Sequence, residues 1–532
     1  MPTLRSQLNH VPKVLQFGTS GRRGLIVDLT QLEIYINVTA ELEYLKSLAP
    51  EAGGIRPGDV FYYALDLRPS SPALCEAAER AIADAGMRGV NLGQIPTPAL
   101  MFHAVGRGCG SVMVTGSHIP FDRNGYKLNT SRGELLKEHE APIGAKVAEV
   151  RERLYAQSFG NSIFDESGAL SDRRALNPAV DAGRAGYLKR YLDFFSSQPV
   201  SLAGRRILVY QHSAVGRDLL AELLARLGAD VIPAGRSDSF VPIDTENIDA
   251  AQLETIRKLA ESHKDLWAVV STDGDSDRPL ILAATPPDGT LKFFGGDLVG
   301  MIVAGYLRAD AVVVPISCND AIDRGSLAGV LEPKTRIGSP FVIAGMAAAK
   351  VKGRRTVCGW EANGGFLLGS GVERNGLGLA ALPTRDAFLP ILGVLFEAAE
   401  RSVGVAELFR ELPRRFSKAG LLKNFPRDAG LEVVRRLTPS QGNPDAHAAV
   451  ATALARVFTR ARGFTSVSRL DYTDGVRIVF SNTDVAHIRP SGNADELRIY
   501  AAADTQIRAD AIVAEGVREP DGILRSLQPL AQ

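Results

Sequence analysis

The chain repeats one pattern, in which an apolar strand is followed by a short polar loop and then by a helix. In the first unit we predict a strand over 60–65 and a helix over 72–85, followed by Gly86. In the second unit we predict a strand over 206–210 and a helix over 214–227, followed by Gly228. A glycine just past a helix is typical of a left-handed helix stop. Strands that alternate with helices indicate α/β domains with largely parallel strand pairing.

A third unit starts at a strand predicted over residues 311–316, and a shorter helical stretch follows it. The C-terminal part of the chain has a different pattern. It predicts a helix over 449–462, strands over 476–480 and 496–500, and a final helix over 509–517. We therefore expect three related α/β domains and a smaller C-terminal α+β domain.

The length of 532 residues allows three or four domains of roughly 100–200 residues each. We predict linkers near Gln198-Pro199, Phe294-Gly295-Gly296 and Leu412-Pro413. The predicted domains are 1–185, 186–295, 296–412 and 413–532.

The apolar fraction of 45% and the charged fraction of 23% are those of an ordinary soluble protein, for which we expect a cytoplasmic location. The formal net charge is +1, so no strong field favours nucleic acid or an anionic membrane as a partner. The four cysteines are far apart, with neither zinc-site nor disulfide-rich spacing, which fits a reducing compartment. We see no signal-peptide core and no apolar run near the ~20 residues that span a membrane. Oligomeric state is not readable from the sequence.

Three aspartates alternate in one short loop, at Asp273, Asp275 and Asp277, between two apolar runs that predict buried strands. Crowded carboxylates repel one another, and a hard divalent cation relieves that repulsion because it binds oxygen ligands. Gly274 lets the loop curl so that alternate side chains converge. A polar turn is the alternative, and we favour a metal site.

Ser117 follows the apolar strand of residues 112–114, which makes it a candidate nucleophile exposed on a turn. An ordinary serine turn or helix cap before proline is the alternative. The aspartate loop tips the balance toward the nucleophile. Lys127 comes shortly after it, within reach of an acid/base role.

Two further loops carry binding chemistry. Glu361 and Asn363 alternate, so both can face one ligand, and glutamate with asparagine suits adjacent sugar hydroxyls. The run Arg489-Pro490-Ser491-Gly492-Asn493 combines an arginine, a serine and free backbone amides, as a phosphate site does. Each loop is also compatible with a plain surface turn. The Gly/Arg-rich run 18–24 is weak evidence alone.

Taken in order, five motifs resemble the α-D-phosphohexomutase superfamily. They are Thr-Ser-Gly-Arg-Arg-Gly, Ser-His-x-Pro, Asp-Gly-Asp-x-Asp-Arg, Gly-x-Glu-x-Asn-Gly and Arg-Pro-Ser-Gly, and they span the whole chain. The resemblance implies mixed sheets around a central cleft, Mg²⁺ as cofactor, and a hexose 1,6-bisphosphate as activator and bound intermediate.

The resemblance also implies a role for each motif. Ser117 would carry the phosphoryl group and bind Mg²⁺ together with Asp273, Asp275 and Asp277. The catalytic centre would include Arg23, His118, Lys127 and Arg278, with Lys127 our first choice for proton transfer and His118 the second. The sugar hydroxyls would meet Glu361 and Asn363, and the distal phosphate would meet Arg489, Ser491, Gly492 and Asn493.

We therefore expect a phosphohexomutase that interconverts hexose 6-phosphate and hexose 1-phosphate, first of mannose, then of glucose, then of glucosamine. Departures from the family pattern, such as Ser339 where histidine is frequent, bear on sugar preference. Two hypotheses from other classes remain: a metal-dependent sugar phosphatase, and a catalytically inactive sugar-phosphate binding protein.

Overall fold

The computed structural model describes residues 1–18, 21–172, 174–246, 248–285, 289–439, 444–490 and 495–531. The chain folds into two compact units. The first unit comprises Met1–Ala311 and Gly338–Phe409, and the second comprises Val312–Ile337 and Arg410–Gln532. Within the described residues, none of the helices combines the length and apolar character needed to cross a bilayer.

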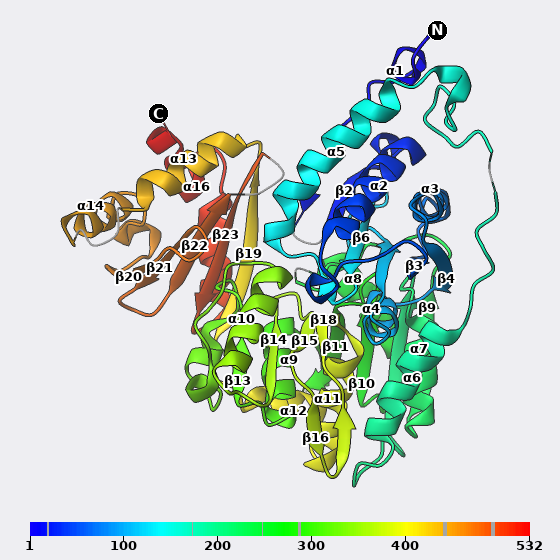
Figure 1. The fold of residues 1–532 in the computed structure, drawn as a ribbon. Helices are drawn as coiled ribbons and strands as arrows, with labels where there is room; N and C mark the ends of the chain where they lie inside the picture. The colour runs from blue at the N-terminus through cyan, green and yellow to red at the C-terminus, as the bar shows by residue number, and fades with distance from the viewer. Residues whose placement is uncertain are drawn as a thin grey trace. The chain divides into compact units, whose positions relative to one another are not determined.

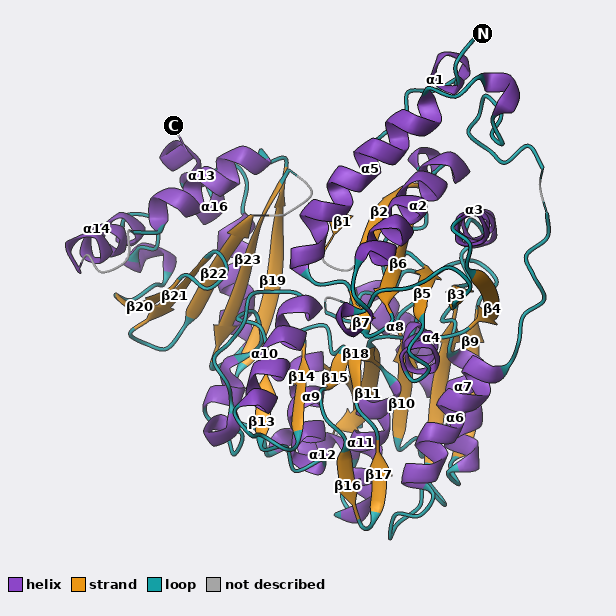
Figure 2. Cartoon of the chain, in the orientation of Figure 1, coloured by secondary structure: helices purple, strands orange, loops and turns teal. Residues whose placement is uncertain are grey.

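The N-terminal sheet of the first unit has the strand order β1-β2-β6-β5-β3-β4, with β7 paired to β6. Strands β2, β6, β3 and β4 are labelled in Figure 1, and β1, β5 and β7 in Figure 2. Its strands are β1 (Phe17–Gly18), β2 (Gly21–Leu25), β3 (Val60–Leu65), β4 (Arg88–Gln94), β5 (Gly110–Val114), β6 (Arg123–Thr130) and β7 (Gly133–Glu134). Its helices are α1 (Leu4–Gln7), α2 (Gln31–Ser47), α3 (Ser71–Asp84), α4 (Thr97–Val105) and α5 (Glu140–Tyr155). Strands β4, β3 and β5 are parallel, and β6 is antiparallel to β5, so the sheet is mixed.

Alternation along β6 places its side chains on two faces. Tyr126 and Leu128 enter the apolar core that α2, α3 and α5 cover. Lys127, between them, belongs to the opposite face of the strand, where it is also buried and pairs with Asp275 and Asp277.

The second sheet has the order β12-β11-β10-β8-β9. Its strands are β8 (Arg206–His212), β9 (Asp230–Arg236), β10 (Ala268–Thr272), β11 (Pro279–Thr285) and β12 (Thr290–Phe294). The nearby helices are α6 (Ala182–Phe195), α7 (Arg217–Arg226), α8 (Ala250–Glu261) and α9 (Gly296–Tyr306). Strand β8 is parallel to β9 and β10, whereas β11 is antiparallel to β10.

The strands and helices predicted for the first two units are confirmed, and the largest boundary shift among them is at the start of α7. Helix α7 begins at Arg217 and not at residue 214. The backbone N–H of Val215 donates to Gly274 O at 2.9 Å, and that of Gly216 donates to Ser276 Oγ at 2.9 Å. Residues 214–216 are not helical because backbone N–H groups of this segment donate to the aspartate loop instead.

The rest of the first unit contains the antiparallel strands β14 (Val357–Trp360), β15 (Phe366–Leu368) and β18 (Leu382–Asp386). It also contains the hairpin of β16 (Val372–Arg374) and β17 (Leu377–Leu379), and helices α10 (Ser339–Val351) and α11 (Phe388–Glu400). Strand β13 is Ala311–Val313, shorter than the predicted 311–316, and α12 is Val405–Arg410.

The second unit is α+β, as predicted. Its antiparallel sheet has the order β19-β23-β22-β21-β20 (Figure 2). The strands are β19 (Phe416–Lys423), β20 (Val467–Asp471), β21 (Val476–Phe480), β22 (Val485–Pro490) and β23 (Glu496–Ala503). The helices are α13 (Arg427–Leu437), α14 (Pro444–Ala455), α15 (Gln506–Val517) and α16 (Ile523–Ser526).

Two helix boundaries in this unit differ from the sequence prediction. Helix α14 ends at Ala455, and a separate 3₁₀ turn covers Arg460–Arg462, so the predicted helix 449–462 is too long at its C-terminus. Helix α15 starts earlier than predicted, because the side chain of Thr505 accepts a hydrogen bond from the backbone N–H of Arg508 and caps it.

Candidate active site

Ser117 stands at the end of β5 in an unusual backbone conformation. Its φ angle is 54°, in the left-handed region, and its side chain is fully buried. The hydroxyl Oγ donates to Asp273 Oδ2 at 2.7 Å and lies 3.3 Å from His118 Nδ1. The structure therefore joins the serine loop to the aspartate loop, which is 156 residues away in sequence.

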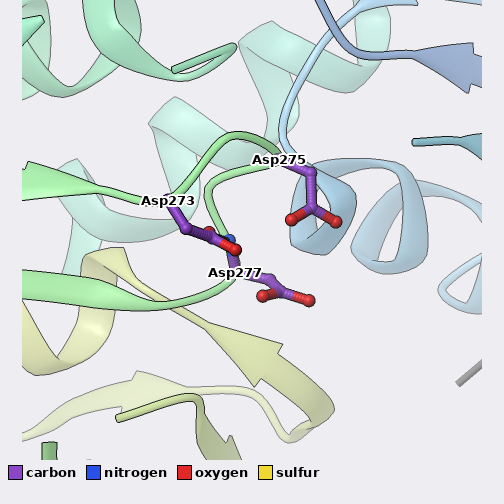
Figure 3. Close-up of side chains that lie close together, drawn as sticks. All are labelled: Asp273, Asp275 and Asp277. Atoms are coloured by element: carbon purple, nitrogen blue, oxygen red, sulfur yellow. Dashed lines mark hydrogen bonds between the residues drawn. The ribbon is translucent and has the colours of Figure 1, made fainter. Parts of the chain in front are cut away.

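The aspartate loop connects β10 to β11, and its three carboxylates gather around one common space (Figure 3). One oxygen from each of Asp273, Asp275 and Asp277 lies within 4.8 Å of the others, and all three side chains are buried. Asp273 Oδ1 accepts from the backbone N–H groups of Asp277 and Arg278, at 3.1 and 3.2 Å, which closes the loop.

These residues fit a hard cation. Among the described residues, Asp275 Oδ1 and Asp277 Oδ1 are buried oxygens without a hydrogen-bond donor. A donor set of carboxylate oxygens and a serine hydroxyl is typical of magnesium or calcium sites. We conclude that the loop can bind a metal.

Charge is unevenly divided over the three carboxyl groups. Desolvation, followed by repulsion from Asp275 and Asp277, holds the pKa of Asp273 well above its usual range. Desolvation acts on Asp275 in the same direction, but Lys127 outweighs it and lowers that pKa. For Asp277, Arg385 is the largest opposing influence, and its pKa is lowered too. The three carboxyl groups are therefore expected to titrate as a coupled set.

The predicted basic residues lie beside this cluster. Lys127 Nζ donates to Asp275 Oδ2 at 2.7 Å and to Asp277 Oδ2 at 2.8 Å. Arg278 Nε lies 3.6 Å from Asp277 Oδ1. Desolvation and the neighbouring cations Arg278 and Arg385 lower the pKa of Arg23 to about 10.

His118 has a neutral ring at neutral pH. Burial, and then the charges of Arg278 and Arg23, lower the pKa of His118 well below its ordinary value of 6.5. Its Nδ1 lies 2.8 Å from Arg278 Nη1, and a guanidinium can only donate. Nδ1 therefore accepts, and the ring proton resides on Nε2.

The loop between β14 and β15 presents Glu361 toward the same cluster. Glu361 Oε2 accepts from Arg385 Nη1 at 3.1 Å. Asn363 lies in this loop as well, but its Oδ1 accepts from the backbone N–H of Gly365 at 3.0 Å. At least one polar atom of Asn363 therefore shapes the loop itself.

Arg385 is the site residue that the sequence analysis missed. It lies on β18, 108 residues from the aspartate loop, and its Nε donates to Asp277 Oδ2 at 3.0 Å. Its side chain is only 4% exposed. Burial alone would lower its pKa, but Asp277, Glu361 and Glu134 outweigh burial and raise that pKa well above its ordinary value. The only sequence signal was a charged pair, Arg385-Asp386, directly before an apolar helix.

A small pocket opens beside these groups. Lys127 and Arg385 line it, as do Thr97, Glu134 and Thr384. Its walls therefore carry cations, hydroxyl groups and carboxylates, which can hydrogen-bond a polar ligand.

The predicted phosphate loop belongs to the second unit. Arg489 lies on β22, and its Nε forms an ion pair with Asp474 Oδ2 at 3.1 Å. Ser491, Gly492 and Asn493 lie outside the described residues. No geometry in this part of the chain tests the phosphate-binding prediction.

Comparisons with known proteins identify the family of this chain. The sequence matches three family models, described as Phosphoglucomutase/phosphomannomutase, alpha/beta/alpha domains I, II and III, over residues 14–154, 185–286 and 295–416. The prediction of three related α/β domains is thereby confirmed. The exact boundaries of the four predicted domains stay a prediction.

Two curated relatives cover nearly the whole chain. A phosphomannomutase of Sinorhizobium fredii (strain NBRC 101917 / NGR234) is 38% identical over 94% of this chain and 98% of its own. A phosphomannomutase of Salmonella muenchen is 37% identical over 94% of each chain.

Solved structures share the fold. The crystal structure of a putative phosphomannomutase from Thermus thermophilus superposes with a TM-score of 0.66 at 21% identity, covering 95% of this chain and 98% of that one. An Aspergillus fumigatus N-acetylphosphoglucosamine mutase, described in complex with GlcNAc-6P and magnesium, has a TM-score of 0.57 at 14% identity and covers 100% of both chains.

Proposed function

Because the chain belongs to the phosphoglucomutase/phosphomannomutase family, we propose that it interconverts hexose 6-phosphate and hexose 1-phosphate, with mannose phosphate as the preferred substrate. One observation carries the chemistry: a buried serine hydroxyl lies 2.7 Å from a carboxylate of a three-aspartate cluster. The mannose preference is supported by the two phosphomannomutases that are 37–38% identical to this chain.

In the proposed reaction, phosphoserine 117 transfers its phosphoryl group to a free hydroxyl of the bound hexose monophosphate. The bond from phosphorus to Ser117 Oγ breaks as the bond to the sugar oxygen forms. The sugar hydroxyl loses its proton, and Ser117 Oγ regains one when it leaves. The product is a hexose 1,6-bisphosphate, which turns over and returns its other phosphoryl group to Ser117.

Lys127 is our first candidate for this proton transfer, because its Nζ lies at the centre of the site, within hydrogen-bond distance of Asp275 and Asp277. His118 is better suited to orientation. Its Nδ1 is already engaged by Arg278, which leaves Nε2–H free to donate to a phosphoryl oxygen on Ser117.

Asp273, Asp275 and Asp277, together with Ser117, would hold Mg²⁺. When bound, the ion supplies positive charge that neutralises the oxygens of the transferring phosphoryl group. Arg23, Arg278 and Arg385 contribute fixed positive charge from the protein itself.

We assign the sugar hydroxyls to Glu361, held by Arg385, and to Asn363. We assign binding of the distal phosphate to Arg489, Ser491, Gly492 and Asn493, because an arginine and backbone amides can both donate hydrogen bonds to a phosphate. A hexose 1,6-bisphosphate serves as intermediate and as activator, because it can phosphorylate Ser117 again after the bisphosphate escapes. The four cysteines are free thiols in the described structure, which suits a reducing cytoplasm. We therefore propose that the enzyme is cytoplasmic.

The test is a coupled assay with mannose 1-phosphate, glucose 1-phosphate and glucosamine 1-phosphate side by side, together with peptide mapping of phosphate. We expect mutase turnover to be greatest with mannose 1-phosphate, and phosphate on Ser117. Ser117→Ala should lose turnover. Release of free phosphate without isomerisation would instead identify a phosphatase.

A further inference from the structure

The loop that follows β3 takes no part in the chemistry above, yet it encloses the backbone of Ser117. Its residues Asp66 and Arg68 are 0% and 2% exposed. Arg68 makes more hydrogen bonds to the serine loop than Asp66 does. Its two terminal nitrogens donate to four backbone carbonyls of the serine loop, those of Ser117, Ile119, Pro120 and Arg123, at 3.1, 2.6, 2.9 and 2.8 Å.

Asp66 holds the other side of the same turn. Its Oδ2 accepts from Thr115 Oγ1 at 2.8 Å and from the backbone N–H of Gly116 at 3.3 Å. Thr115 Oγ1 in turn accepts from the N–H of Ser117 at 2.8 Å. The amide and the carbonyl of Ser117 are therefore both fixed, one through Asp66 and the other by Arg68.

This enclosure matters because Ser117 is strained. A φ of 54° is unfavourable for a residue with a side chain, and it persists only where the surroundings impose it. Rotation of Ser117 out of this conformation would move Oγ away from Asp273. The reaction requires Oγ and the aspartate loop to be aligned to a fraction of an ångström.

Arg68 is also linked to the aspartate loop through Phe240. Its guanidinium carbon lies 3.7 Å from the centroid of the Phe240 ring. The same ring lies beside Gly274, where an added Cβ would come 3.0 Å from Phe240 and 2.6 Å from Ser117 O. The serine loop and the aspartate loop thus meet at a contact that Arg68 helps to build.

We propose that Arg68, whose Nε lies 3.5 Å from Asp66 Oδ2, is a positioning residue that fixes Ser117 in its left-handed conformation and aims Oγ at the aspartate loop. Arg68 acts through Ser117 and contacts no reacting atom. The inference rests on the proposed mutase function, and it adds a residue whose loss slows phosphoryl transfer without weakening sugar binding.

The experiment compares Arg68→Met, which keeps the aliphatic stem but removes every donor, with Arg68→Lys. The measured quantities are kcat, KM for mannose 1-phosphate, and the rate at which dephosphorylated enzyme takes a phosphoryl group from hexose 1,6-bisphosphate. We expect kcat and the phosphorylation rate to fall about 100-fold in Arg68→Met while KM stays within about threefold. Arg68→Lys should lie in between, because an ammonium cannot reproduce the fork of four bonds.

Arg151→Met is the matched control. Arg151 is 8% exposed and pairs with Glu33, and none of its hydrogen bonds goes to the serine loop within the described structure. The control should lose thermal stability and keep kcat. Amide hydrogen exchange adds a readout that does not depend on the reaction: peptides covering 115–120 should exchange about tenfold faster in Arg68→Met and unchanged in Arg151→Met.

A folded Arg68→Met variant with kcat and exchange near wild type would overturn the proposal, as would an equal loss of kcat in Arg151→Met. If Arg68→Met does not fold, the same two measurements on Arg68→Lys decide. Wild-type protein without mutase turnover and without phosphate on Ser117 would instead refute the proposed function, whereas the exchange result would still judge Arg68.

Discussion

The three carboxyl groups of the aspartate loop differ in their hydrogen-bond partners. Asp275 and Asp277 accept from Lys127, and Asp277 accepts from Arg385 as well. Asp273 instead accepts from the hydroxyl of Ser117 and from two backbone amides. Neighbouring negative charge and burial disfavour its ionised form. The aspartates are alike in sequence and should differ when mutated.

We therefore predict that two isosteric changes reduce the stability of the protein by different amounts. Asp273→Asn should leave the metal-free protein within about 0.5 kcal/mol of wild type, because a neutral side chain replaces one that resists ionisation. Asp275→Asn should cost about 3 kcal/mol, because it weakens a buried ion pair with Lys127. Denaturant unfolding in excess chelator measures both. Equal losses would contradict this division.

Both variants should lose stabilisation by Mg²⁺, since each removes one of the three carboxylates. Thermal unfolding with and without added Mg²⁺ tests this expectation. Wild-type protein should unfold at a higher temperature in Mg²⁺, because a ligand of the folded state stabilises it by mass action. No upward shift in wild type would argue against the metal site.

At the scale of elements, β18 brings distant segments together. Its register against β15 shifts between the pairs Phe366–Asp386 and Leu368–Leu382, so β18 bulges around Thr384 and Arg385. A bulge re-aims side chains. Thr384 donates to Glu134 at 2.6 Å, Arg385 reaches Asp277 and Glu361, and Asp386 accepts from Tyr187 and Tyr191.

Arg385→Lys should therefore reduce kcat/KM about 100-fold, or roughly 3 kcal/mol, although the charge is kept. Separate nitrogens of the guanidinium bond Asp277 and Glu361, and one ammonium cannot hold both in the same geometry. Steady-state kinetics with mannose 1-phosphate measure the effect. Lys189→Arg, an exposed change paired with Asp193 on α6, is the control and should be neutral. Near-normal kcat/KM in Arg385→Lys would remove β18 from the site.

At the scale of the whole molecule, each of the two units contains a buried histidine. His212 is in the first unit and His487 in the second, and desolvation lowers the pKa of each to about 4. A histidine whose pKa is lower in the folded state binds its proton more readily when unfolded. The contribution of such a histidine to the free energy of unfolding is fully present above about pH 6.5 and is lost as pH falls toward 4.

Each histidine should therefore destabilise the protein by up to about 3 kcal/mol between pH 6.5 and pH 4. Denaturant unfolding at several pH values measures the slope. His212→Gln and His487→Gln should each flatten it relative to wild type, whatever their effect at pH 7. A slope unchanged in both variants would show that other groups govern acid sensitivity.

The sequence predicted those parts of the molecule that local chemistry specifies. Alternating apolar residues located strands such as β21, and the three alternating aspartates identified the metal-type loop. Arg68 and Arg385 were not predicted as site residues, because their partners are about 50 to 110 residues away and no spacing rule connects them. The boundary of α7 failed for the same reason, since Val215 bonds to Gly274.

The wide sequence separation of the site residues has a consequence for folding. Ser117 Oγ meets Asp273 across 156 residues, and Arg385 meets Asp277 across another 108. Contacts between residues so far apart in sequence are expected to form late in folding, after the local helices and strands that carry these residues. During synthesis, the serine emerges long before the groups that activate it. Recovery of phosphorylation at Ser117 should therefore be among the last events of refolding, so that a nascent or half-folded chain cannot react with sugar phosphates.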